Sequence, residues 1–261
     1  MMKKQLTLFL SALQFYTRIP IPANIPFDAS NLNPASRFLP MIGWLVGGVA
    51  ALVWMIFAFV DVHVAIICSM LTSILVTGAL HEDGFADFCD GFGGGWTKEK
   101  ILLIMKDSRI GAYGVIGLIG MLGLKFSLLN ALSQFTDSAI LGFYMISAHA
   151  LSRLMCVMVI FYSTYARNTN DSKSGFVVQK ISIATILVGF VFGTIPLIFL
   201  SLTLQSAFIF LVIPLLAMIT FSMGSYFKKW IGGYTGDCLG AVQQVCEVTF
   251  YFFLLILWKF I

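Results

Sequence analysis

An unusually dense group of carboxylates lies between residues 82 and 90. The chain has only 12 Asp and Glu residues, and Glu82, Asp83, Asp87 and Asp90 are among them. Asp83, Asp87 and Asp90 are spaced i, i+4 and i+7, so on a helix they project from one face and repel one another. A bound cation would remove that repulsion. Carboxylate oxygens suit Mg²⁺, Mn²⁺ or Ca²⁺ rather than zinc, and Mg²⁺ binds one or two carboxylates together with substrate phosphates.

We therefore predict a phosphate-handling Mg²⁺ site with Asp83, Asp87 and Asp90 as metal ligands. The alternative interpretation is a solvated helix end that holds no ligand.

Glycines follow the carboxylates. Gly91, Gly93, Gly94 and Gly95 predict a loop whose backbone N–H groups are open to an anion, so Gly93 and Gly94 are candidate substrate-binding residues. A flexible turn out of the helix is the alternative. The segment is not a P-loop, because no Gly-Lys-Ser/Thr follows it.

Lys106 and Arg109 come shortly after, just before an apolar segment. A lysine binds phosphate as a point charge and an arginine binds it as a planar fork. We predict that both stabilise phosphate charge during catalysis. Both could equally act as determinants of membrane topology, and the two roles are compatible.

Three ionisable residues, Lys125, Arg153 and Glu247, fall inside apolar segments. Such residues are functional candidates by default, each with a partner. We predict that Arg153 and Glu247 bind substrate, with Arg153 either paired with Glu247 or pointing into the active cavity. A purely structural pair is the alternative, and the sequence does not decide whether Lys125 snorkels or faces the cavity.

Asp237 follows Gly232, Gly233 and Gly236, which permit a tight approach of the backbone to a ligand. The residue starts the last apolar segment. There it either caps a helix or completes a metal shell, and we include it among the substrate-binding candidates.

Seven apolar segments must position these side chains, at about 20 residues per membrane crossing. They cover 41–60, 63–81, 110–133, 139–164, 181–201, 206–226 and 239–258. Three polar connections separate them, namely 82–109, 165–180 and 227–238. We predict an all-α, polytopic membrane bundle in one domain, 1–261, with short interfacial helices. One of these is an amphipathic helix near the N-terminus with Leu6, Phe9, Leu10 and Leu13 on one face.

Composition agrees with a membrane protein. Hydrophobic residues make up 59% of the chain and charged residues 11%, whereas soluble domains carry about 25% charged residues. The five cysteines form no CxxC pair, and we interpret them as reduced packing residues.

The cations orient the bundle. With the N-terminus inside, all 16 Lys and Arg residues except Lys125, Arg153 and Lys259 fall on the cytoplasmic side. We predict a bacterial inner-membrane protein whose active site faces the cytoplasm. The net charge of +4 then reflects topology and not nucleic-acid binding.

Taken together, the motifs resemble the cobalamin synthase family, the adenosylcobinamide-GDP ribazoletransferases. The resemblance runs almost end to end, with Phe85 where the family has Leu. The matching strings are Phe15-Tyr16-Thr17-Arg18-Ile19-Pro20, Pro40 with Gly43 and Gly47, Glu82-Asp83-Gly84-Phe85-Ala86-Asp87 through Asp90-Gly91, Met105-Lys106-Asp107-Ser108-Arg109-Ile110-Gly111, Arg153, and Gly233-Tyr234-Thr235-Gly236-Asp237.

The resemblance implies that adenosylcobinamide-GDP and α-ribazole, or its 5′-phosphate, give adenosylcobalamin, or its 5′-phosphate, and GMP. It also implies dependence on Mg²⁺. In the reaction that the resemblance implies, Glu82 or one of the aspartates deprotonates the incoming hydroxyl, so Glu82 and Asp83 are candidate catalytic residues. Lys106 and Arg109 neutralise charge on the phosphates. The lipid bilayer is the expected environment, and a homo-oligomer or other enzymes of cobalamin biosynthesis are the expected protein partners. The alternatives are another metal-dependent membrane phosphotransferase, acting on a lipid, and a transporter.

Overall fold

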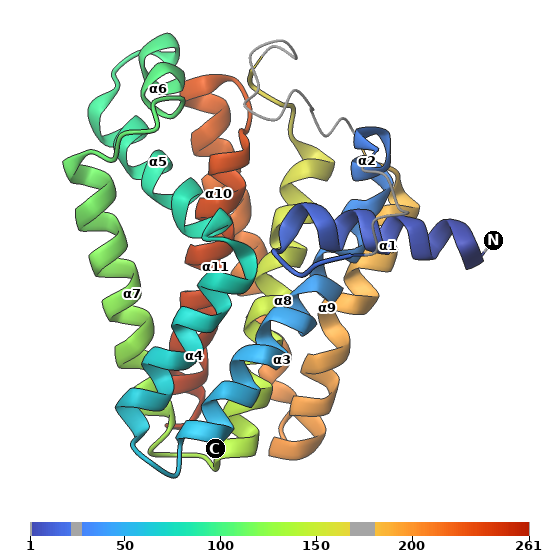
Figure 1. Ribbon diagram of the computed structural model, residues 1–261, viewed down its shortest axis with the longest axis vertical. Helices are drawn as coiled ribbons and strands as arrows, with labels where there is room; N and C mark the ends of the chain where they lie inside the picture. The colour runs from blue at the N-terminus through green and yellow to red at the C-terminus, as the bar shows by residue number, and fades with distance from the viewer. Residues whose placement is uncertain (1, 22–27, 168–180, 261) are drawn as a thin grey trace.

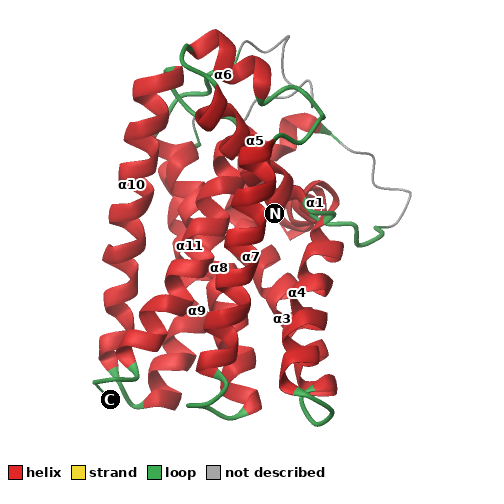
Figure 2. Cartoon of the chain, turned by 90° about the vertical axis from the view of Figure 1, so that its left-hand side faces the viewer, coloured by secondary structure: helices red, strands yellow, loops and turns green. Residues whose placement is uncertain are grey.

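A computed structural model describes residues 2–21, 28–167 and 181–260. Within these ranges the chain forms an elongated bundle of helices (Figures 1 and 2). The one isolated β-bridge in the described ranges joins Tyr165 and Tyr234. The predicted all-α fold is confirmed.

Eleven α-helices are present in the described residues. Their bounds are α1 Met2–Tyr16, α2 Leu32–Ala35, α3 Leu39–Phe57, α4 Val62–Thr77, α5 Leu80–Gly94, α6 Lys98–Ile104, α7 Ala112–Leu132, α8 Ser138–Tyr162, α9 Ile183–Leu204, α10 Val212–Ile231 and α11 Gly236–Leu257. In the described residues, six continuous helical segments are long and apolar enough to cross a membrane. The pair α4 and α5 adds a seventh crossing if it is counted as one bent span.

The second predicted crossing, 63–81, is wrong as an uninterrupted helix. The chain bends by 88° between α4 and α5, where Gly78 and Ala79 both have positive φ, at 64° and 58°. The segment after α1 lies in this bend, because the Arg18 amide donates to the Val76 carbonyl at 2.7 Å. A Cβ on Gly78 would lie 2.3 Å from Arg18 Nε. Glycine therefore permits both the left-handed backbone and the close contact.

Helix α8 forms the centre of the bundle. Its side chains are mostly buried, and α3 packs against it through glycines. A Cβ on Gly43 would lie 2.3 Å from the His149 carbonyl oxygen, and one on Gly47 would lie 2.7 Å from Ile146 Cα. These two glycines of the family motif therefore let two helix backbones touch, as small residues do in membrane bundles.

Two of the described connections lie at one end of the bundle. Figure 1 shows α6 and the α10–α11 turn together at that end, while the α3–α4, α7–α8 and α9–α10 connections lie at the other. Lys98 and Lys106 lie between α5 and α7, Arg167 follows α8, and Lys229 lies in the last turn of α10. Lys173 and Lys180 lie outside the described residues.

Helix α1 lies across the bundle instead of along it (Figure 1). Leu8 and Leu13 are buried against the other helices, whereas Leu6 is exposed. The amphipathic helix is thus present, and its location at the membrane interface stays a prediction. The five cysteines carry free thiols, as expected.

Candidate active site

A cavity of about 250 Å³ lies where the first turns of α5 and α11 meet. Its polar wall is formed by His81 and Asp83 from α5, Asp237 from α11 and Arg167 from the segment after α8. Aromatic side chains form much of the remaining wall, from Phe15, Tyr16, Tyr165 and Tyr234. The cavity therefore combines two carboxylates and a guanidinium with flat apolar surfaces.

Two glycines bring the carboxylates together. A Cβ on Gly84 would lie 3.1 Å from Asp237 Cα, and one on Gly240 would lie 2.9 Å from the His81 carbonyl oxygen. The backbones of α5 and α11 are thus in contact just where Asp83 and Asp237 enter the cavity. Larger residues at either glycine would force the two helices apart.

Asp237 does not cap α11, because that role falls to Thr235, whose hydroxyl accepts from the Cys238 amide at 3.3 Å. Arg167 Nη2 instead lies 3.1 Å from Asp237 Oδ2, in an ion pair whose side chains are 6% and 17% exposed. Of the two roles that the sequence left open for Asp237, helix capping is therefore excluded.

Arg167 is held in place by pairing of two short segments. The Tyr234 amide donates to the Thr164 carbonyl at 2.9 Å, and the Ala166 amide donates to the Tyr234 carbonyl at 2.8 Å. A Cβ on Gly233 would lie 2.0 Å from the Thr164 carbonyl oxygen. The glycine before Tyr234 is thus required for the pairing that presents Arg167 to the cavity.

A second cavity, of about 290 Å³, adjoins the first, and Arg167 belongs to both walls. Lys98 and Lys106 line this second cavity, together with Glu99 and apolar residues of α6. The arrangement places a basic chamber beside an acidic one. Lys106 thus lines a cavity, and its contact with phosphate stays a prediction.

Arg109 lies elsewhere. Its guanidinium is 87% exposed and pairs with Asp107 at 2.7 Å, and the Asp107 carboxylate raises its pKa. Arg109 is absent from the walls of both cavities. Its catalytic role stays a prediction.

The three predicted metal ligands do not converge on one point. Asp90 accepts from the Gly111 amide at 2.7 Å and from the Gly114 amide at 2.8 Å, so its carboxylate caps the first turn of α7. At about 1.5 Å per residue, Asp83 and Asp90 are separated by about 10 Å along α5. In the described residues, no group of three His, Cys, Asp or Glu side chains is placed to hold a metal ion. The structure therefore does not bring the three carboxylates together, and metal binding by Asp83, Asp87 and Asp90 stays a prediction.

The prediction of a glycine-rich loop at Gly93 and Gly94 is wrong. Gly93 and Gly94 lie inside α5, and the Gly95 amide donates to the Gly91 carbonyl. These amides serve the helix and do not form an anion-binding loop. A Cβ on Gly93 would lie 2.6 Å from the Tyr113 ring, so this glycine permits close packing onto α7. Substrate binding by Gly93 and Gly94 stays an untested prediction.

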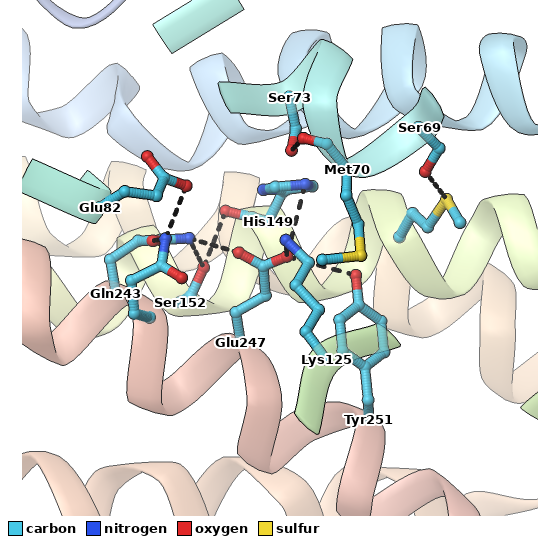
Figure 3. Close-up of polar contacts among 12 residues, drawn as sticks. Ser69, Met70, Ser73, Glu82, Lys125, His149, Ser152, Gln243, Glu247 and Tyr251 are labelled. Atoms are coloured by element: carbon cyan, nitrogen blue, oxygen red, sulfur yellow. Dashed lines mark hydrogen bonds and ion pairs between the residues drawn. The ribbon is translucent and has the colours of Figure 1, made fainter. Parts of the chain in front are cut away.

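Glu247 lies at the centre of a buried polar network (Figure 3). It forms an ion pair with Lys125 and accepts a hydrogen bond from Gln243 Nε2 at 2.7 Å. His149 Nε2 lies 3.5 Å from the same carboxylate, and the Tyr251 hydroxyl donates to it at 3.4 Å. Lys125 therefore faces the protein interior. The sequence had left open whether this side chain snorkels or faces the cavity.

Arg153 does not pair directly with Glu247. Its Nη1 contacts His149 Nδ1 and the His149 carbonyl oxygen, both at 3.0 Å. Because a guanidinium only donates, Nδ1 accepts and His149 carries its proton on Nε2, toward Glu247. The predicted Arg153–Glu247 pair is thus replaced by an indirect link through His149. Neither residue belongs to the walls of the two cavities.

Glu82 connects this network to the cavity edge. Gln244 Nε2 donates to Glu82 Oε1 at 2.9 Å and also lies 2.9 Å from Gln243 Oε1. Glu82 Oε2 is buried, with no hydrogen-bond partner among the described residues. Glu82 therefore lies behind the cavity wall that His81 and Asp83 form, and not in it.

The residues of the first cavity fit a divalent cation of the Mg²⁺ type. Asp83 and Asp237 supply two oxygen-donor side chains to one space, and Mg²⁺ takes one or two carboxylates and completes its shell with phosphate oxygens and water. A site of three protein ligands is therefore not needed. Asp87 lies one turn from Asp83 on α5 and is half-buried.

Sequence reasoning missed Arg167, which it treated only as a topology determinant. Lys98 was likewise missed, as were the amide side chains Gln243 and Gln244 as links between carboxylates. The available signal was indirect. The glycines before Asp237 indicated a close backbone approach, but the sequence did not show that the Thr164–Arg167 segment is the partner.

Comparisons with known proteins agree with one another. A family model described as cobalamin-5-phosphate synthase matches residues 8–255. An adenosylcobinamide-GDP ribazoletransferase of Shewanella oneidensis is 42% identical over 254 residues, which cover 97% of this chain and 95% of that protein. The protein of the same name from Shewanella halifaxensis is 42% identical over 262 residues, with 98% and 97% covered. No solved structure matches this chain.

Proposed function

The chain belongs to the cobalamin-5-phosphate synthase family, and we propose that it is an adenosylcobinamide-GDP ribazoletransferase. A hydroxyl of α-ribazole, or of its 5′-phosphate, attacks the phosphorus attached to the cobinamide arm. A new P–O bond forms to ribazole, and the bond from that phosphorus to the bridging oxygen breaks. GMP leaves with the bridging oxygen, and the hydroxyl proton passes to a base.

One observation carries the proposal beyond family membership. Two aspartates that are distant in sequence, Asp83 and Asp237, line one cavity, and a chamber containing Lys98 and Lys106 adjoins it. Transfer at a diphosphate depends mostly on positioning and charge stabilisation. An acidic half that holds a cation and a basic half that holds phosphate supply both.

We assign the Mg²⁺ ligands to Asp83 and Asp237, with Asp87 as a further candidate on the next turn of α5. When bound there, Mg²⁺ neutralises diphosphate charge and polarises the phosphorus that is attacked. Asp90 is assigned to capping α7, because both of its oxygens accept backbone amides.

The remaining roles belong to the protein's own side chains. Lys106, which lines the basic chamber, stabilises the charge that develops on the leaving GMP. The proton acceptor is expected among the titratable groups of the cavity wall, where His81 and Asp83 lie. Glu82 supports this wall from behind through its hydrogen bond with Gln244.

The end of the bundle that contains α6 and the α10–α11 turn is proposed to face the cytoplasm of a bacterial inner membrane. The described Lys and Arg residues between α5 and α7, Arg167 after α8 and the two lysines in the last turn of α10 lie at this end, whereas Lys259 follows α11 at the other. Cytoplasmic loops carry an excess of Lys and Arg. Both cavities are at the cation-rich end.

Purified protein with Mg²⁺, adenosylcobinamide-GDP and α-ribazole tests the proposal. GMP release that requires α-ribazole is the expected result. Folded protein that releases no GMP under these conditions would contradict the assignment. Transfer to a lipid acceptor, or uptake of substrate without chemistry, would instead favour the phosphotransferase or transporter alternatives.

A further inference from the structure

Arg167 combines two properties that a purely surface cation lacks. Its side chain is 6% exposed, and its Nε is buried without a hydrogen-bond partner among the described residues. A guanidinium has five N–H donors in a rigid fork. Leaving a donor of a buried charged group unsatisfied is costly, so such a group usually has a further ligand.

Its position is equally specific. Arg167 belongs to the walls of both cavities, between the carboxylates of Asp83 and Asp237 on one side and the ammonium groups of Lys98 and Lys106 on the other. A diphosphate that extends over both cavities would meet this guanidinium, because Arg167 lines both. Its geometry suits phosphate oxygens, which it can bind in two parallel hydrogen bonds.

The backbone around Arg167 is fixed by contacts that do not involve its side chain. The pairing of Thr164 and Ala166 with Tyr234 anchors the segment, and Gly233 permits the approach. Lys98 is close to the same turn, since a Cβ on Gly232 would lie 3.4 Å from its Nζ. Both cations are therefore set against one turn, the one that leads into α11.

We propose that Arg167 is a substrate-binding residue that binds the diphosphate of the nucleotide substrate at the junction of the two cavities. This inference rests on the proposed function and names a residue for it. In the structure, Asp237 pairs with Arg167. When the substrate binds, the phosphate oxygens take the donors that Asp237 does not use. Arg167 thereby orients the bridge between the two phosphorus atoms.

A structural ion pair is the competing explanation, because buried pairs are by themselves weak evidence of function. The two explanations differ in what a substitution changes. A structural pair would lower stability and affect both substrates alike. A diphosphate-binding residue affects the nucleotide substrate selectively.

The test uses Arg167→Met, Arg167→Lys and the control Lys229→Met, each as full-length protein in detergent. Lys229 is an exposed cation in the last turn of α10 and lines neither cavity. The first readout is KM for adenosylcobinamide-GDP and for α-ribazole, each varied with the other saturating. The second is binding of GDP alone, measured by calorimetry.

We expect Arg167→Met to raise the KM for adenosylcobinamide-GDP, and to weaken GDP binding, by roughly tenfold or more. The KM for α-ribazole should change less than about twofold. Lys229→Met should behave as the unchanged protein. Arg167→Lys keeps the charge opposite Asp237 but loses the planar fork, so it should preserve the melting temperature and still weaken GDP binding.

Equal changes in both KM values, or GDP binding that Arg167→Met leaves intact, would overturn the inference. If Arg167→Met does not fold, Arg167→Lys decides the matter, and GDP binding of unchanged strength in that variant contradicts the proposal. GDP binding also separates this inference from the proposed function. Unsubstituted protein that binds GDP through Arg167 but releases no GMP with α-ribazole would refute the proposed function alone.

Discussion

At the scale of single residues, the site depends on two aspartates that start different helices, Asp83 in α5 and Asp237 in α11. Each enters the same cavity, and Asp237 is already paired with Arg167. The proposed function uses the negative charge of both carboxylates. The charge of each aspartate therefore matters more than its volume.

Asp83→Asn and Asp237→Asn keep shape and remove charge. We expect each to lower kcat by roughly 10²–10³-fold, the cost of losing one electrostatic contact to the transition state. The measurement is GMP release at saturating Mg²⁺, with the melting temperature as a check on folding. Asp28→Asn is the matched control, because Asp28 is an exposed residue that hydrogen-bonds Ser30. Activity close to that of the control in either variant would remove that aspartate from the site.

Lys125 and Glu247 give a second prediction at this scale. Lys125→Met leaves the Glu247 carboxylate without its ion-pair partner in a buried position, and breaking such a pair costs about 3–5 kcal/mol. The double variant Lys125→Met, Glu247→Gln should recover most of that stability. Unfolding in a denaturing detergent measures both. A double variant as unstable as Lys125→Met alone would show that the pair is not the source of the loss.

At the scale of helices, Asp90 joins α5 to α7 and is not among the Mg²⁺ ligands that we propose. Asp90→Ala removes the acceptor of the Gly111 and Gly114 amides, and loss of a helix cap costs about 0.5–2 kcal/mol. We expect a lower melting temperature with an unchanged Mg²⁺ concentration for half-maximal activity. A large rise in that concentration would instead return Asp90 to the metal site.

The crossing of α5 and α11 supplies the next prediction. In Gly240→Ala the new Cβ would lie 2.9 Å from the His81 carbonyl oxygen, so the helices must separate, whereas a Cβ on Gly120 meets nothing within 4 Å. The same chemical change should therefore reduce GMP release in Gly240→Ala and leave it intact in Gly120→Ala. In Gly120→Ala, the alanine should also stabilise α7 by up to about 1 kcal/mol. Equal activity in the two variants would show that the crossing does not set the site.

The sequence predicted the helices better than it predicted their breaks and contacts. Apolar run length sufficed for most crossings, because a bilayer demands it. The bend between α4 and α5 was not predicted, because Ala79 has a left-handed backbone that its residue type does not favour. The spacing of Asp83 and Asp90 gave their shared face correctly. It could not show that the Gly111 and Gly114 amides occupy Asp90, because that contact is tertiary.

The sequence indicated the candidate site residues that belong to local patterns and missed those whose positions depend on tertiary contacts. Asp83, Asp237 and Lys106 were found from local patterns, and the structure places all three on the two cavities. Arg167 was not found, because its position in the cavity wall depends on pairing of its segment with Tyr234. The loop predicted at Gly93 and Gly94 is part of α5, because glycines that permit helix packing have the same composition as an anion-binding loop.

At the scale of the whole molecule, the account needs the two cavities on the cytoplasmic side. Gln134 lies in the α7–α8 turn, and Lys229 lies near the end of α10, at the other end of the bundle. In a cysteine-free background, a membrane-impermeant thiol reagent should label Gln134→Cys in cells with a permeabilised outer membrane and spare Lys229→Cys. Disrupted membranes should allow both to react. Labelling of Lys229→Cys alone before disruption would show that the bundle has the opposite orientation in the membrane.

The central claim is that Asp83 and Asp237 hold one cation against the substrate diphosphate. A structure of the protein with Mn²⁺ in place of Mg²⁺ and adenosylcobinamide-GDP, with the anomalous signal of the metal recorded, tests it directly. The account predicts a metal peak about 2.1 Å from a carboxylate oxygen of each aspartate and in contact with phosphate oxygens. A metal peak that touches the diphosphate but neither aspartate would contradict it.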